Sequence, residues 1–260
     1  MNRLPRLTAN GTLLALSGLT LGGLAACSDV TAAPASRAMT LSFATSPAGA
    51  AAISAALAGA ADPLVITKAQ LVLSRTELET VNGNCASNDV EGDDDGCAEL
   101  KLGPMLVDLP LTSGAKTALS VAVPAGSYDK IEAKIDAVAS ESDGHRQDAA
   151  TFLAAHPEFR NTSIRVEGTF NGQPFVYTTA LDTEMEMAFN PPLVIDGTGG
   201  NLTVQVDLST WFLGRDGATI DPATANAGGA NRSLVEDNIK RSFKVFEDDD
   251  HDGRDDGRND

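Results

Sequence analysis

The chain has few cations for its length: its 260 residues include 19 Lys and Arg against 36 Asp and Glu, a formal net charge of −17. Proteins bind nucleic acid largely through cationic contacts with phosphate, so this imbalance argues against a nucleic-acid partner. It also argues against attachment to anionic lipid by surface charge. Strong acidity does suit solubility and the binding of divalent cations through carboxylates.

The N-terminal apolar stretch, residues 12–26, is too short and too rich in glycine to span a bilayer comfortably. It follows Arg3 and Arg6 and ends in small residues, which is the layout of a secretory signal. Leu24-Ala25-Ala26-Cys27 also resembles the bacterial lipobox, where the chain is cut before a cysteine that receives a diacylglyceryl group. An ordinary signal peptide, or a buried N-terminal helix, with a chance cysteine is the alternative.

The lipobox resemblance implies that Cys27 is lipidated and acylated on its new amine. One fatty chain binds a membrane only marginally, at about 0.8 kcal/mol per buried CH₂, whereas two or more hold a protein there permanently. By the same resemblance, Ser28 after the cysteine favours the outer membrane of a Gram-negative bacterium. The mature chain loses two arginines and no acids, so its charge is 17 minus 36, or −19.

Cysteine is scarce, and only Cys85 and Cys97 remain once Cys27 is assigned to the lipid. Zinc is not expected, because there is no second cysteine pair and the three histidines are scattered. In an oxidising compartment, two thiols this close in sequence are most simply a disulfide. Closing such a loop stabilises a fold by about 3 kcal/mol in the chain-entropy model.

Apolar and polar residues alternate from Leu64 onward, which is typical of half-buried strands. In residues 64–79 we assign Val65, Thr67, Ala69, Leu71 and Leu73 to one face. The dipeptide Asn171-Gly172 favours a type I′ hairpin turn, because both residues accept positive φ. We predict a mainly β fold, an antiparallel β-sandwich of seven to nine strands, with a barrel as the alternative.

Two helices are expected beside the strands. Residues 148–159 have the composition of a short crossover helix. Residues 233–246 form the C-terminal helix, capped by Ser233, with one apolar stripe made by Val235, Ile239, Phe243 and Phe246. The expected division is a signal peptide at 1–26, a tether at 27–63 in which 40–46 is a candidate first strand, one domain at 64–246 and an acidic tail at 247–260.

The acidic tail contains the sharpest local motif. Asp248, Asp250, Asp252 and Asp256 occupy relative positions one, three, five and nine, with Gly253 at six, which is the D-x-D-x-D-G spacing of calcium loops. Position twelve is Asn259 rather than Glu, and no exit helix follows. A solvated acidic tail is therefore the alternative to a specific Ca²⁺ site. Residues 88–97 carry consecutive acids, which favours a solvated loop.

Catalysis has little support in the sequence. There is no G-x-S-x-G elbow, no H-E-x-x-H, no P-loop and no dinucleotide fingerprint. Aromatic residues make up only 5% of the chain, and Trp211 is expected to plug the core rather than to form a ligand platform with Phe212, Phe175, Tyr177 and Tyr128. We do not expect an enzyme.

Several segments together resemble an uncharacterised family of bacterial lipoproteins that carry a single β-sandwich domain of unknown function. The resemblance covers residues 64–213 and rests on VITKAQLVLSRTEL, VDLPL, VPAGSYDKIEAKI, SIRVEGTFNG and VQVDLSTWF. It implies a lipoprotein location and lends no catalytic residues. The expected function is a membrane-anchored, non-catalytic binding or structural module of the cell envelope, with an unknown protein or glycan as its ligand. A carbohydrate-binding or adhesion module and an unusual hydrolase are the alternatives.

Overall fold

The computed structural model describes residues 36–46, 63–81, 104–112, 114–138, 146–196, 199–248, 250 and 252–254. The chain divides into a unit of residues 1–33 and a compact unit of residues 34–260, and every described residue belongs to the second. Cys27, Cys85, Cys97 and Asp256 lie outside the described residues. Lipidation and the disulfide therefore stay predictions.

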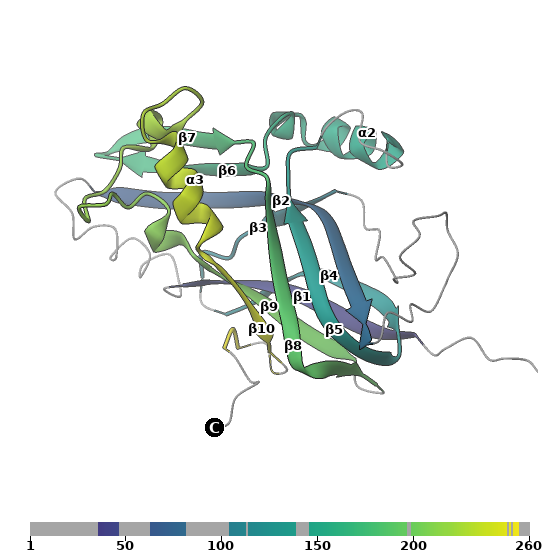
Figure 1. Cartoon of the computed structure of the whole chain (residues 1–260). Coiled ribbons are helices and arrows are strands. Elements are labelled where there is room, and N and C mark those ends of the chain that lie inside the picture. The colour runs from purple at the N-terminus through teal and green to yellow at the C-terminus, as the bar shows by residue number, and fades with distance from the viewer. Residues whose placement is uncertain are drawn as a thin grey trace, which may run out of the picture. The chain divides into compact units, whose positions relative to one another are not determined.

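The described chain is mainly β and forms two sheets that pack together as a sandwich (Figure 1). One sheet has the order β10-β9-β1-β4; the other has the order β7-β6-β2-β5-β8, with β3 paired to β2. Ten strands are described where seven to nine were expected. Their bounds are β1 Ser36–Ser46, β2 Leu64–Thr80, β3 Met105–Asp108, β4 Lys116–Pro124, β5 Gly126–Ile135, β6 Ile164–Phe170, β7 Gln173–Thr179, β8 Thr183–Ile195, β9 Gly200–Asp207 and β10 Phe243–Glu247.

Strand β1 includes the candidate first strand at 40–46 but is longer. It begins at Ser36, inside the segment 27–63 that the sequence otherwise assigns to a tether, and it is an inner strand of the four-stranded sheet. It pairs antiparallel with β4 but parallel with β9, so the sandwich is not antiparallel throughout. The alternating segment Met39-Thr40-Leu41-Ser42-Phe43 explains the strand, because its apolar residues all face one side. The folded part of the chain thus includes residues from Ser36 onward.

One hydrophobic core fills the space between the two sheets. Met39, Phe43 and Val204 come from the four-stranded sheet, and Leu71 and Val166 from the six-stranded sheet; all are fully or almost fully buried. The two sheets remain separate layers, which is the sandwich rather than the barrel alternative. The hairpin predicted at Asn171-Gly172 joins β6 to β7, and both residues have positive φ as that turn requires.

Strand β2 contains an irregularity that the predicted alternation does not include. Its pairing with β6 shifts register between Ile66 and Lys68, which is a β-bulge. The bulge reverses the alternation, so that Ile66 faces the core before it whereas Ala69 and Leu71 face the core after it. Val65 and Thr67 are therefore exposed, which corrects their assignment to the same face as Leu71.

A second, smaller apolar cluster lies under the crossover helix. Helix α2, Arg146–Ala155, and the 3-10 turn η2, Pro157–Phe159, occupy the segment predicted as a crossover helix. Their Phe152, Leu153 and Phe159 pack with Val72 of β2 and Val138. Because Val72 alternates with Leu71, this cluster covers the face of the six-stranded sheet opposite to the main core.

The predicted C-terminal helix ends early. Helix α3, Arg232–Lys240, buries Val235 and Ile239 as expected, but Phe243 and Phe246 belong to β10 and face opposite sides of the sheet. Phe243 and Val245 face the core on either side of Lys244, and the segment pairs with the edge of β9, which explains the strand. The expected cap is also corrected: helix α3 starts after Asn231, not at Ser233. A cap is also present at the turn η3, Leu208–Thr210, where the Asp207 carboxylate accepts from Ser209 N.

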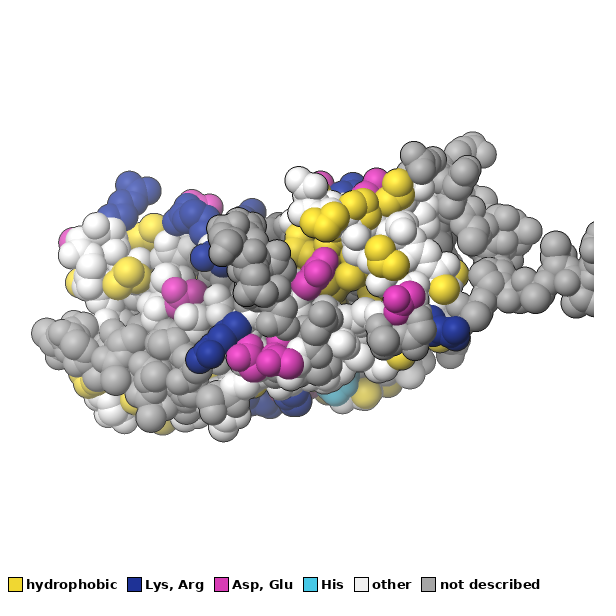
Figure 2. Space-filling view, turned by 90° about the horizontal axis from the view of Figure 1, so that it is seen from below, with side chains coloured by type: hydrophobic (Ala, Val, Ile, Leu, Met, Phe, Trp, Pro, Cys, Tyr) yellow, Lys and Arg dark blue, Asp and Glu magenta, His cyan; other side chains and the backbone are white. Residues whose placement is uncertain are grey.

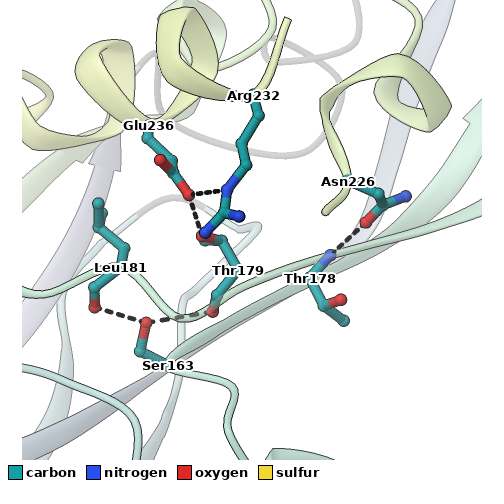
Figure 3. A network of polar contacts seen from close by, with 7 residues as sticks. All are labelled: Ser163, Thr178, Thr179, Leu181, Asn226, Arg232 and Glu236. Carbon is teal, nitrogen blue, oxygen red and sulfur yellow. Dashed lines mark hydrogen bonds and ion pairs between the residues drawn. The ribbon is translucent and has the colours of Figure 1, made fainter. Parts of the chain in front are cut away.

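A polar network fastens α3 and its neighbouring turn to β7 (Figure 3). Glu236 accepts hydrogen bonds from Thr179 Oγ1 at 2.5 Å and from Arg232 Nε at 2.8 Å. Burial of Glu236 raises its pKa, but the two hydrogen bonds and the nearby cations lower the pKa by more. The net pKa therefore lies below the ordinary value. Asn226, at the end of the turn η4, Pro222–Ala225, binds the backbone of β7 through Thr178 N and Val176 O. This contact occupies the free edge of β7.

Candidate metal centre

Asp248 is positioned by the pairing of β10 with β9. Phe246 pairs with Thr203 in antiparallel register, and two residues later Asp248 N donates to Asn201 O at 3.3 Å. Alternation along β10 then places Asp248 on the same face as Phe246, the outer face of the four-stranded sheet, away from Val245 and the main core. The side chain of Asp248 is 0% exposed.

The three carboxylates of the predicted calcium motif that the structure describes lie together. One carboxylate oxygen from each of Asp248, Asp250 and Asp252 lies within 4.8 Å of the others. Asp250 and Asp252 are exposed, so one side of the cluster is open to water. The cluster could hold a metal ion. The fourth predicted ligand, Asp256, lies outside the described residues, as does the acidic segment 88–97.

Backbone hydrogen bonds fold the loop around this cluster. Gly253 N donates to Asp248 Oδ2 at 3.1 Å, and Asp252 N donates to Asp250 Oδ1 at 3.0 Å. Gly253 has φ +83°, the left-handed conformation that glycine adopts without strain. The glycine at relative position six thus makes the sharp turn that the motif predicts.

The second oxygen of Asp248 lacks a partner. Asp248 Oδ1 is buried and accepts no hydrogen bond from any described residue. A buried polar atom without a partner costs about 1–3 kcal/mol, and a charged one costs more. A hard cation among the three carboxylates would satisfy this oxygen and offset the mutual repulsion of the acids. Asp248 and Gly253, at the start of the expected tail 247–260, are both buried.

Several other surface carboxylates already have protein cations beside them. Lys130 Nζ on β5 lies 2.7 Å from Glu79 Oε1 and also binds Glu132, and these two hydrogen bonds raise the Lys130 pKa. On the face shown in Figure 2, several acidic side chains likewise lie close to Lys or Arg. The cluster at Asp248 differs, because its one ion pair among the described residues joins Asp252 to the exposed Arg254 at 3.7 Å.

The aromatic residues do not form an exposed strip. Tyr128, Tyr177, Trp211 and Phe212 are buried, and Phe175 is half-buried. Trp211 Nε1 donates to Ser242 Oγ at 2.8 Å, as expected for a core plug whose N–H needs a partner. Burial raises the pKa of Tyr177, and the Glu236 carboxylate adds to this effect. This arrangement counts against a carbohydrate platform built from these side chains.

A shallow cleft of about 450 Å³ lies between helix α3 and the loop after η3. Leu213, Arg215, Asp237, Asn238 and Arg241 are among its lining residues. Asn238 holds this wall in place by donating to the backbone oxygens of Trp211 and Leu213. His156 is not among the lining residues. The His156 ring instead packs against Phe152 in a tilted arrangement, with a centroid distance of 5.0 Å. His145 lies outside the described residues.

The described part of the chain contains no helix long and apolar enough to cross a membrane. The chain matches no family model and no curated protein. Among solved structures it is similar to MbnP from Methylosinus trichosporium, with 15% sequence identity and a TM-score of 0.41, over 83% of this chain and 98% of that one. This likeness is too distant to carry a function, so the function must be argued from the aspartate cluster.

Proposed function

We propose that the chain is a lipid-anchored, non-catalytic module of the cell envelope that binds Ca²⁺ at its C-terminal loop. The observation that carries the cation site is Asp248 Oδ1, a fully buried carboxylate oxygen without a partner among the described residues, beside Asp250 and Asp252. The lipobox-like sequence before Cys27 and the resemblance to envelope lipoproteins support the anchor.

Calcium suits this cluster better than magnesium. Ca²⁺ accepts six to eight oxygen ligands in flexible geometry, whereas Mg²⁺ demands near-ideal octahedral geometry and keeps several waters. Three carboxylates at alternate positions of one loop, with two of them open to water, match the looser requirement. Because the described cluster supplies only three acids, we expect the weak affinity of extracellular modules, with a Kd of about 10⁻⁴–10⁻³ M.

Isothermal titration of the mature chain with CaCl₂ tests the cation site. We expect one site, and a loss of affinity of at least about tenfold in Asp250→Asn, because a ligand that repels its neighbours in the empty state is replaced by a weaker neutral one. Asp182→Asn is the matched control: it removes one exposed carboxylate that lies near Lys134 instead. No binding heat up to several millimolar Ca²⁺, or equal affinity in Asp250→Asn, would overturn the cation site.

The anchor needs a separate experiment. Metabolic labelling with palmitate in a Gram-negative host should label the wild-type chain and leave Cys27→Ser unlabelled. Globomycin, which blocks the lipoprotein signal peptidase, should cause the longer precursor to accumulate. A mature chain with an unmodified Cys27 would contradict the anchor and leave the cation site untouched.

A further inference from the structure

Strand β1 is covered on both of its faces in its second half, around Ser42 and Ala44. Leu41 and Phe43 point into the main core, whereas Ser42 and Ala44 alternate with them and face outward. Ser42 and Ala44 are nevertheless only 0% and 4% exposed. Ser42 hydrogen-bonds Thr117 of β4 at 3.2 Å, but an alanine methyl can be buried only by atoms that pack on top of it.

The loop that carries the proposed Ca²⁺ site, Asp248 to Gly253, packs against Ala44. Gly253 is buried, and a Cβ atom at Gly253 would lie 3.2 Å from Ala44 Cβ and 3.8 Å from the backbone nitrogen of Ala115, directly before β4. The start of the same loop is bound to β9 through Asp248 N and Asn201 O. The loop therefore leads from β9, across the outer face of β1, to the start of β4.

We propose that the cation acts as a clasp: by neutralising Asp248, Asp250 and Asp252, it seats residues 248–254 on the outer face of β1 and thereby holds β10 at the edge of its sheet. This inference rests on the proposed Ca²⁺ site and adds its structural effect. Without the cation, the carboxylates repel one another and Asp248 Oδ1 stays unpaired, so the loop separates from Ala44. Phe246, 8% exposed on the same face as Asp248, then becomes accessible to solvent.

The clasp predicts a coupling that works in both directions. If Ca²⁺ binding seats the loop, then a substitution that blocks seating must weaken Ca²⁺ binding by the same factor, even though it removes no ligand. Ala44→Leu is such a substitution, because its larger side chain occupies the space of Gly253. Ala38→Leu is the matched control: it makes the same change on the same face of β1 at an exposed position.

The experiment combines titration with CaCl₂ and hydrogen exchange of the mature chain, in Ca²⁺ and in EDTA. In the wild type we expect Ca²⁺ to slow exchange at least tenfold in peptides covering residues 36–46 and 243–254, and to leave the β6–β7 hairpin, residues 164–179, unchanged. Ala44→Leu should raise the Kd for Ca²⁺ at least tenfold, and Ala38→Leu should leave it unchanged. If Ala44→Leu does not fold by circular dichroism, Ala44→Val replaces it with the same expectation, because it enlarges the same side chain by less and leaves the loop sequence unchanged.

The outcomes separate the two proposals. Ca²⁺ binding without a change in exchange at 36–46 and 243–254, or wild-type affinity in the folded Ala44 variant, overturns the clasp and leaves the Ca²⁺ site standing. No Ca²⁺ binding by the wild type overturns the site and the clasp together. Slower exchange together with weakened binding in the Ala44 variant supports both.

Discussion

At the scale of single residues, Glu236 shows how one side chain fixes a helix to a sheet. It projects from α3, accepts from Thr179 of β7 and from Arg232 one turn earlier, and is mostly buried (Figure 3). Its pKa is lowered in the folded chain because the charged form is hydrogen-bonded. A carboxyl group with a lowered pKa stabilises the fold above its ordinary pKa, and this contribution is lost as the pH falls through the folded-state value.

We therefore predict a pH-dependent cost for Glu236→Gln. At pH 7 the variant should lose about 1 kcal/mol of unfolding free energy, because charge-assisted hydrogen bonds become neutral ones. The gap from the wild type should shrink as the pH falls below about 4.5, the ordinary pKa, where the wild-type carboxyl also becomes neutral. Urea unfolding at pH 7, 5 and 3.5 measures it. A gap that stays constant with pH would contradict the assigned role of the charge.

The aspartate cluster was predictable from sequence in its spacing but not in its burial. Alternation of Asp248, Asp250 and Asp252 is visible in the sequence, because a shared ion requires alternate side chains to converge. The burial of Asp248 depends on residues 243–247 being a strand, whereas the sequence favours a helix there. The contact of Gly253 with Ala44 joins residues more than 200 positions apart, and no local pattern indicates it.

At the scale of elements, the outer face of β2 shows how a short helix becomes part of the fold. Phe159 of η2 is 0% exposed and packs with Phe152 of α2 and Val72 of β2. This cluster is separate from the main core, and its described members come chiefly from α2, η2 and β2. The attachment of α2 to the sheet should therefore depend on very few side chains.

Replacing Phe159 by alanine should destabilise the chain by about 3–5 kcal/mol, the usual cost of removing a large buried aromatic side chain. Urea unfolding measures the loss. His156→Ala is the control, because its ring contacts the same aromatic cluster but is half-exposed, and we expect it to cost about 1 kcal/mol or less. If the Phe159 variant lost no more stability than the His156 variant, the cluster would not hold α2 in place.

Elements with strong local patterns were predicted well, and the misplaced ones depend on distant contacts. The hairpin at Asn171-Gly172 follows from turn chemistry alone, and the structure has it. The bulge near Thr67 reverses a face, and the glycine that accommodates it, Gly168, lies in the partner strand β6, where a Cβ atom would clash with the backbone oxygen of Val65. Helix α3 ends at Lys240 because β9 offers an unpaired edge to residues 243–247, and that edge exists only in the folded sheet.

At the scale of the whole molecule, one core couples the two sheets. The buried residues between them form a single cluster that also reaches Trp211, Val235 and Ile239, so neither sheet keeps its inner face buried if the other unfolds. We predict one cooperative transition for the compact unit in urea, with coincident curves from Trp211 fluorescence and far-UV circular dichroism. Two separated transitions would show that the sheets unfold independently.

Thr40 of β1 and Asn201 of β9, hydrogen-bonded at 2.5 Å, lie 161 positions apart in the sequence. During synthesis, the nascent chain therefore presents β1 long before its parallel neighbour leaves the ribosome. The four-stranded layer can close only after Gly200–Asp207 have left the ribosome. The export proposed above would benefit from this delay, because a chain that cannot complete its fold early stays threadable through a translocation pore.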